Sequence, residues 1–267
     1  MRSLPIEHAS WISGALWRLF APFSSRHRRM IAQLRAAYPD ETRGERTKLA
    51  IQSWDTMGRV FAESFRLEDI LNSDRVIVED IENVRNRLSA TKGFIACTAH
   101  QGNWEIAVVG FAKLGIRTAG IYRRLKNPLV NDMALAQRVP LYPDGLFPKQ
   151  ASTALLAAKY VKAGGALSIM ADLRERGGIK VPFFGRLAPS NAFPAYLAVT
   201  LKKPVFVAHV MRDPGVRFRI RLEEIDVSTT GDRDANVLAT TAAIQAALER
   251  NIRSRPGEWM WAHGRWV

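Results

Sequence analysis

Apolar and polar positions along the chain follow a pattern that predicts strands and helices in turn. Residues 94–98 form a short apolar run typical of a buried strand, and residues 106–114 follow with helical spacing. The pattern continues with strands expected at residues 117–122, 166–170, 204–211 and 216–222, and with helices at residues 129–138, 153–163, 192–201 and 235–253. This alternation predicts an α/β fold in which helices flank a central, mostly parallel sheet.

The first 44 residues have a different character. No acidic residue occurs between residues 9 and 39, where arginines accompany large apolar side chains. These are Arg18, Arg26, Arg28, Arg29 and Arg35, with Trp11, Ile12, Leu16, Trp17, Leu19, Phe20 and Phe23. We expect residues 1–44 to form amphipathic helices at an anionic membrane surface, with apolar side chains among the headgroups and arginines on the phosphates. The alternative is that this segment packs on the protein's own core.

The remaining residues, 45–267, are expected to form a single α/β domain that begins with a helix over residues 45–65. No repeat or linker divides them. The sequence contains no apolar run of about 18 residues, so we predict neither a transmembrane helix nor a classical signal peptide.

Composition narrows the class of partner. The chain has 39 Lys and Arg against 25 Asp and Glu, a formal net charge of +14. Such a charge favours an anionic partner, which is a nucleic acid, an anionic membrane or an acidic protein or substrate. The single cysteine, Cys97, excludes a disulfide framework and zinc sites built on several cysteines, and its apolar surroundings predict a buried, inert thiol. We therefore expect no metal site.

The candidate chemistry follows the first predicted strand. His100 begins the segment HQGNWE, which ends at Glu105, and ligands in parallel sheets bind beyond the carboxyl ends of the strands. On one continuous helix the two side chains would point about 140° apart. If Asn103 is the N-cap and Gly102 turns the chain, the imidazole can fold back toward the Glu105 carboxylate. We therefore predict His100 as general base, oriented by Glu105.

This segment resembles the H-x₄-[DE] motif of the lysophospholipid acyltransferase superfamily, and among its members the chain is most similar to the bacterial lipid A biosynthesis acyltransferases. Further blocks carry the resemblance: YRRLKNPL at residues 122–129, Asp172 after a strand, GG at residues 177–178, VPFFGR at residues 181–186, and the Trp-rich end at residues 256–266. The likeness spans residues 93–267. It implies a glycerol-phosphate-acyltransferase-like α/β fold.

The resemblance also implies a reaction. Enzymes of this family take a fatty acyl group from an acyl thioester, on acyl carrier protein or coenzyme A, and esterify a hydroxyl of a lipid A precursor or related glycolipid at the bacterial inner membrane. For this chain it implies a peripheral protein on the cytoplasmic face, with acyl carrier protein as a partner and no cofactor besides the thioester. A lysophospholipid, a mannoside or another acceptor remains an alternative.

Four further residues are candidates for binding the substrate. Arg138 stands at the spacing after Glu105 where the family places a functional arginine. Arg123 lies in a family block and can receive a phosphorylated glycolipid or an acidic carrier protein, and Arg186, in another block, can bind phosphate. Asp172 is either a site residue or the ion-pair partner of a nearby arginine, Arg174 or Arg176.

Two departures from the family concern attachment and substrate. Family members usually begin with a membrane-spanning helix, whereas this chain offers only the interfacial segment described above. Gln101 also replaces the residue, often aromatic, that follows the motif histidine in the family. Two alternative functions of another class, a nucleic-acid-binding protein and an ester hydrolase, have less support. The sequence carries no recognisable nucleic-acid-binding motif, no Gly-x-Ser-x-Gly for a serine hydrolase, and no Walker or dinucleotide fingerprint.

Overall fold

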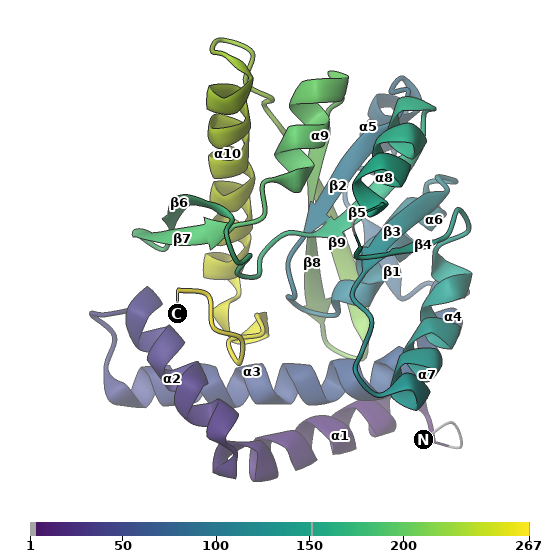
Figure 1. Cartoon of the computed structure of the whole chain (residues 1–267). Coiled ribbons are helices and arrows are strands. Elements are labelled where there is room, and N and C mark those ends of the chain that lie inside the picture. Colours follow the sequence, from purple (N-terminus) through teal and green to yellow (C-terminus); the bar gives the residue numbers. More distant parts are fainter. Residues whose placement is uncertain (1–3, 151, 267) are drawn as a thin grey trace.

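The computed structural model describes residues 4–150 and 152–266, and a mixed sheet forms its centre (Figure 1). Within these residues the sheet has seven strands in the order β1-β9-β8-β2-β5-β3-β4. Their bounds are β1 (Val76–Val78), β2 (Phe94–Thr98), β3 (Thr118–Tyr122), β4 (Leu146–Pro148), β5 (Ala166–Met170), β8 (Val205–Asp213) and β9 (Arg217–Ile225). All neighbours pair in parallel except β8 and β9, which pair antiparallel. The predicted α/β class is confirmed.

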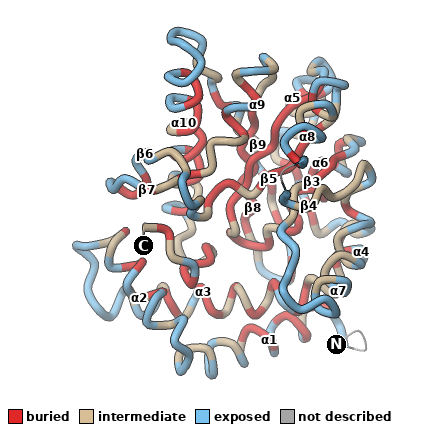
Figure 2. The backbone as a smooth tube through the Cα atoms, viewed as in Figure 1, coloured by how far each residue is buried: buried red, intermediate tan, exposed pale blue. Residues whose placement is uncertain are grey.

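Helices cover both faces of this sheet. One face packs against α8 (Thr153–Lys162), α9 (Phe193–Leu201) and α10 (Arg233–Ser254), and the other against α5 (Ile81–Ser89) and α6 (Ala107–Lys113). The central strand β2 explains why its residues read as a continuous apolar run. Ile95 and Cys97 pack in the core under α8, α9 and α10, and Phe94 and Ala96 pack in the core under α5 and α6. Every position of β2 is therefore buried (Figure 2).

The N-terminal segment folds into two helices. These are α1 (Ile6–Phe20) and α2 (Ser25–Ala37), separated by the short turn η1 (Ala21–Phe23) that contains Pro22. The helix α3 (Arg43–Glu63) follows, opened by a capping box between Thr42 and Glu45. Figure 1 shows α1 and α3 side by side below the sheet, where they pack together.

The residues that α1 turns inward are mostly small. Its buried positions are Ile6, Ala9, Ser10, Ser13 and Gly14. Its exposed positions include Trp11, Ile12, Leu16, Leu19 and Phe20, and Phe23 in η1 is 86% exposed. Small residues let α1 approach α3 closely: a Cβ on Gly14 would lie 2.7 Å from the Asp55 carboxylate. These five large side chains of α1 therefore face outward, whereas Trp17, expected among the interfacial residues, is half-buried and packs against Trp54 of α3.

Several short elements did not follow from the sequence pattern. They are β1, β4, α5, η2 (Ser64–Arg66), α4 (Leu67–Leu71) and the antiparallel hairpin of β6 (Ile179–Phe183) and β7 (Arg186–Ser190). The hairpin turn places Phe184 at φ +53° and Gly185 at φ +71°. Phe183 and Phe184 are both buried in the main core, as expected for aromatic residues beside Val181.

A buried carboxylate joins the N-terminal helices to the sheet. Glu63, at the end of α3, is fully buried and accepts hydrogen bonds from Ser10 Oγ (2.6 Å) on α1 and from Asn103 Nδ2 (2.9 Å) beyond β2. Arg212 on β8 donates from Nη1 and Nη2 to the two carboxylate oxygens, each at 2.7 Å. Burial alone would raise the pKa of Glu63, but the charge of Arg212 and these hydrogen bonds hold it below its usual value.

We predict that Glu63→Ala lowers the free energy of unfolding by about 3–5 kcal/mol, because it leaves the Arg212 guanidinium buried without its partner. Urea unfolding at neutral pH measures this loss. Glu82→Ala is the control, since Glu82 pairs with Arg85 while its side chain is 73% exposed, and it should cost less than about 1 kcal/mol.

The pH dependence of this loss has a definite sign. The folded-state pKa of Glu63 lies below the unfolded value of about 4.3. The contribution of the Glu63 carboxylate to the free energy of unfolding is therefore complete above the unfolded-state pKa. It disappears as the pH falls through the lower folded-state pKa. Wild type and Glu63→Ala should converge in acid, and a gap that stayed constant down to pH 3 would contradict the assignment.

Candidate active site

Strand register brings His100 and Asp172 together. β2 and β5 are parallel neighbours, and Thr98 at the end of β2 pairs with Met170 at the end of β5. His100 and Asp172 each lie two residues beyond this pair, at the carboxyl edge of the sheet. The edge is where ligands bind in parallel sheets.

Asp172 holds the imidazole and its backbone at once. Its Oδ1 lies 2.8 Å from His100 Nδ1, and its Oδ2 accepts the backbone N–H of His100 at 2.8 Å. Asp172 is fully buried, whereas the His100 side chain keeps 17% of its surface exposed. With Nδ1 engaged by the carboxylate, Nε2 is the ring nitrogen left for a substrate.

The C-terminal segment closes over this pair. Trp259 donates its indole N–H to Asp172 Oδ2 at 2.7 Å. The backbone N–H of Met260 bonds to the carbonyl of His100 at 3.0 Å, and the N–H of Gly102 bonds to the carbonyl of Glu258 at 3.0 Å. The Trp-rich end thus fixes the loop that carries His100, a role that nothing in the sequence assigned to Trp259.

These donors decide the charge of Asp172. Burial in the core would raise the pKa of this carboxyl, but the positive charge of a protonated His100 and the hydrogen bonds from His100 and Trp259 outweigh burial and hold the pKa below its usual value. The buried group is therefore a carboxylate at neutral pH. It stabilises a proton on the imidazole beside it.

Glu105 does not orient His100, and this part of the sequence prediction was wrong. Its carboxylate is held by Arg138, whose Nε lies 3.1 Å from Oε1 and 2.9 Å from Oε2 and whose Nη2 also donates to Oε1. Trp104 Nε1 donates to the same Oε1 at 3.1 Å, and the Trp104 ring centroid lies 5.3 Å from that of His100. Trp104 contacts both groups, and the imidazole takes Asp172 as its partner.

The local chain explains this geometry. Asn103 caps the short turn η3 (Trp104–Ile106), as predicted, by accepting the N–H of Glu105 at 3.2 Å. Gly102 has φ +59°, and a Cβ there would lie 2.7 Å from the carbonyl oxygen of Val210. The predicted turn at Gly102 is present, but it leads Glu105 toward α7 (Pro128–Arg138) instead of back to the ring.

The other predicted residues lie apart from this pair. Arg123 is exposed in the loop after β3, and Arg186 is exposed at the start of β7. Within the described residues, neither side chain makes a hydrogen bond or ion pair. Asp172 binds His100 rather than Arg174 or Arg176, which settles its local partner. Cys97 is buried, and burial raises the pKa of its thiol to about 12, consistent with an inert side chain.

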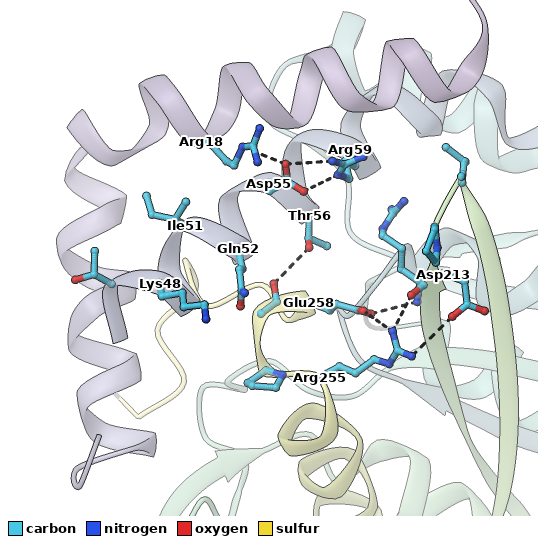
Figure 3. Close-up of a pocket in the computed structure, with 17 residues that line it drawn as sticks. Arg18, Lys48, Ile51, Gln52, Asp55, Thr56, Arg59, Asp213, Arg255 and Glu258 are labelled. Atoms are coloured by element: carbon cyan, nitrogen blue, oxygen red, sulfur yellow. Dashed lines mark hydrogen bonds and ion pairs between the residues drawn. The ribbon is translucent and has the colours of Figure 1, made fainter. Parts of the chain in front are cut away.

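A separate cavity of about 770 Å³ lies between α1, α3 and the turn η5 (Pro256–Glu258), shown in Figure 3. Carboxylates already pair with its arginines: Asp55 with Arg18 and Arg59, and Glu258 with Arg255. The arginines of the cavity are therefore paired with carboxylates, Arg212 with Glu63 among them, and Lys48 adds one further positive charge to the lining. The cavity does not include His100.

Comparison with known proteins identifies the family. The model of the bacterial lipid A biosynthesis acyltransferases matches residues 1–267, the whole chain. The chain belongs to this acyltransferase family. It is also 25% identical to the phosphatidylinositol mannoside acyltransferase of Mycolicibacterium smegmatis, over 100% of this chain and 88% of the relative. The corresponding enzyme of Mycobacterium tuberculosis is 25% identical over 87% of this chain and 72% of the relative.

Among residues 4–150 and 152–266, no helix combines the length and the apolar character needed to cross a bilayer.

We predict that Asp172→Asn lowers the kcat of acyl transfer by about 10²- to 10⁴-fold with the fold intact. Two N–H donors, from His100 and Trp259, converge on one carboxylate oxygen, so the new amide must turn its oxygen toward them and its NH₂ toward Nδ1. The imidazole then carries its proton on Nε2 and cannot act as a base there.

Steady-state acyl transfer at one pH, with circular dichroism as a check on folding, measures this effect. Asp234→Asn is the matched control, because the Asp234 side chain is 87% exposed. A folded Asp172→Asn protein that turns over within about threefold of wild type would show that the carboxylate does not set the tautomer.

Proposed function

We propose that this acyltransferase moves a fatty acyl chain from a thioester, on acyl carrier protein or coenzyme A, to a hydroxyl of an anionic membrane glycolipid. The observation that carries the proposal is the imidazole of His100, held at Nδ1 by a buried carboxylate while Nε2 remains available at the edge of the sheet. Family membership supplies the acyl-transfer class.

The reaction needs no nucleophile from the protein. His100 Nε2 removes the proton of the acceptor hydroxyl as its oxygen attacks the thioester carbonyl. The tetrahedral intermediate collapses, the C–S bond breaks, and the imidazolium returns its proton to the departing thiolate. An ester and a free thiol result, and Asp172 stabilises the imidazolium between the two steps.

Glu105 and Arg138 act beside this centre as a charged pair. Glu105 occupies the Nε and Nη2 donors of Arg138, so Nη1 is left to meet an oxygen of the substrate. Burial opposes the charge of Arg138, but the attraction of Glu105 keeps the pKa of the guanidinium above its ordinary value. A permanent cation there suits either the thioester oxyanion or an acceptor phosphate. Arg123 and Arg186 are proposed to contact phosphate groups farther out.

What the comparisons share supports a glycolipid as the acceptor class. The family is named for lipid A and the two relatives for phosphatidylinositol mannoside. Both names describe glycolipids that carry phosphate, which a protein of net charge +14 would favour. A lipid A precursor and a phosphatidylinositol mannoside are therefore the first two acceptors to test.

Attachment to the membrane is proposed to use α1. Five of its large apolar side chains, Trp11, Ile12, Leu16, Leu19 and Phe20, face outward. A peripheral position on the cytoplasmic face of the bacterial inner membrane would bring the protein to acyl carrier protein and to its acceptor.

We predict transfer of a radiolabelled acyl chain to a glycolipid acceptor, with loss of at least about 10²-fold in the His100→Ala protein. Acyl carrier protein and coenzyme A thioesters are supplied separately, each with a lipid A precursor, a phosphatidylinositol mannoside or a lysophospholipid. Gln137→Ala is the control, because Gln137 is next to Arg138 in sequence but makes none of the hydrogen bonds described above.

Label in the acceptor that disappears with His100→Ala would support the mechanism and name both substrates. Transfer only to the lysophospholipid would replace the glycolipid acceptor. Equal turnover in wild type and His100→Ala would overturn the role of His100.

A further inference from the structure

Helix α7 has two unlike sides. Its inner side carries Arg138, which binds Glu105 beside the active site, and the half-buried residues Asn131, Ala134 and Leu135. At 100° per residue, Leu129 lies about 180° from Arg138 and Met133 about 140° from it. These two residues therefore point away from the protein.

The outer side of α7 is apolar and uncovered. Leu129 is 74% exposed and Met133 is 56% exposed. Leu125 and Val130 beside them, and Val139 just beyond the helix, are also exposed, and no residue of α7 is buried. Neighbouring large apolar side chains of this kind mark a contact surface, because each remains in water without a covering partner.

Positive charge borders this apolar side. Arg123, Arg124 and Lys126 precede the helix and are all exposed, and none of them has an ion-pair partner within the described residues. The helix itself contains one acidic residue, Asp132. Apolar side chains bordered by cations match the acyl and phosphate layers of an anionic bilayer.

Helix α7 lies at the same end of the molecule as α1 (Figure 1). α7 packs against η2, and Arg66 of η2 donates to the carbonyl of Leu4 at 3.1 Å, two residues before α1 begins. The start of α1 and the helix that carries Arg138 are thus joined through one short turn.

We propose that α7 is a second bilayer-binding element, which inserts Leu129 and Met133 into the interface while Arg124 and Lys126 meet lipid phosphates. The proposal rests on the proposed function for its choice of a lipid partner. It adds a consequence, since α7 bound to the bilayer holds the opposite side of the same helix, with Arg138 and Glu105, at the membrane surface where an acceptor arrives.

Vesicle binding tests this surface without requiring any acyl transfer. The full chain is sedimented with vesicles of phosphatidylglycerol and phosphatidylcholine (1:1, about 0.1 M salt), and with phosphatidylcholine alone. The test variant is Leu129→Gln with Met133→Gln. The matched control is Leu155→Gln with Leu238→Gln, which removes two comparably exposed leucines from α8 and α10, elements that lie higher in Figure 1.

We expect the α7 variant to lose at least about tenfold in partition onto the anionic vesicles, with the control within about twofold of wild type. Arg124→Gln with Lys126→Gln should lose about fivefold per side chain, and this loss should vanish in salt near 1 M. Equal binding by the α7 variant, its control and wild type would overturn the proposal. Loss in both double variants alike would assign the effect to general apolarity and overturn it as well.

Failure here is distinguishable from failure of the proposed function. His100→Ala should bind vesicles as wild type does, because the imidazole is not on this surface. The α7 variant should transfer acyl chains normally to an acceptor dispersed in detergent and poorly to the same acceptor in vesicles. Poor transfer in both forms would mean that the change disturbs Arg138 rather than membrane binding.

Discussion

The parallel register of β2 and β5 is the constraint on which the candidate site depends. It pairs Thr98 with Met170 and so places His100 and Asp172 at equal distances past the strand ends. A slip of one residue would turn one of the two side chains to the other face of the sheet. The buried Asp172 carboxylate is tolerated because three N–H groups, two from His100 and one from Trp259, supply hydrogen bonds that replace water.

The short loop beyond β2 gives the two carboxylates of the site different partners. Asp172 belongs to the imidazole, and Glu105 belongs to Arg138. Gly102 adopts the left-handed conformation and Asn103 caps the turn, so Glu105 is directed toward α7. The imidazole of His100 needs one anion to stabilise the proton that it accepts, and the half-buried guanidinium of Arg138 needs another to offset its partial loss of water. Assigning Glu105 to His100 would have left Arg138 without a counter-charge.

Much of the fold could be predicted from local pattern, and the site only in part. The bounds of β2 and β5 agree with their apolar runs, and the cap at Asn103 was predictable because it acts within two residues. The partner of His100 was not predictable in this way. Asp172 lies 72 residues away and Trp259 a further 87, so their contacts depend on the order of strands and on the path of the C-terminal segment. Short elements such as β4, with three residues, carry too little periodicity to be recognised.

The outward apolar side of α1 has a physical origin in how the helix packs. α1 meets α3 through Ser10, Ser13 and Gly14, where Ser13 donates to the carbonyl of Gly58 at 2.6 Å, and Trp17 packs beside this contact against Trp54 and Phe61 of α3. Trp11, Ile12, Leu16, Leu19 and Phe20 face outward. Ser10 also bonds to Glu63, which binds Asn103 in the loop of His100. A bilayer that covers the outer side of α1 would remove its exposed apolar side chains from water. The same helix is joined through Glu63 of α3 to the loop that carries His100, so membrane binding and the position of the base are physically connected.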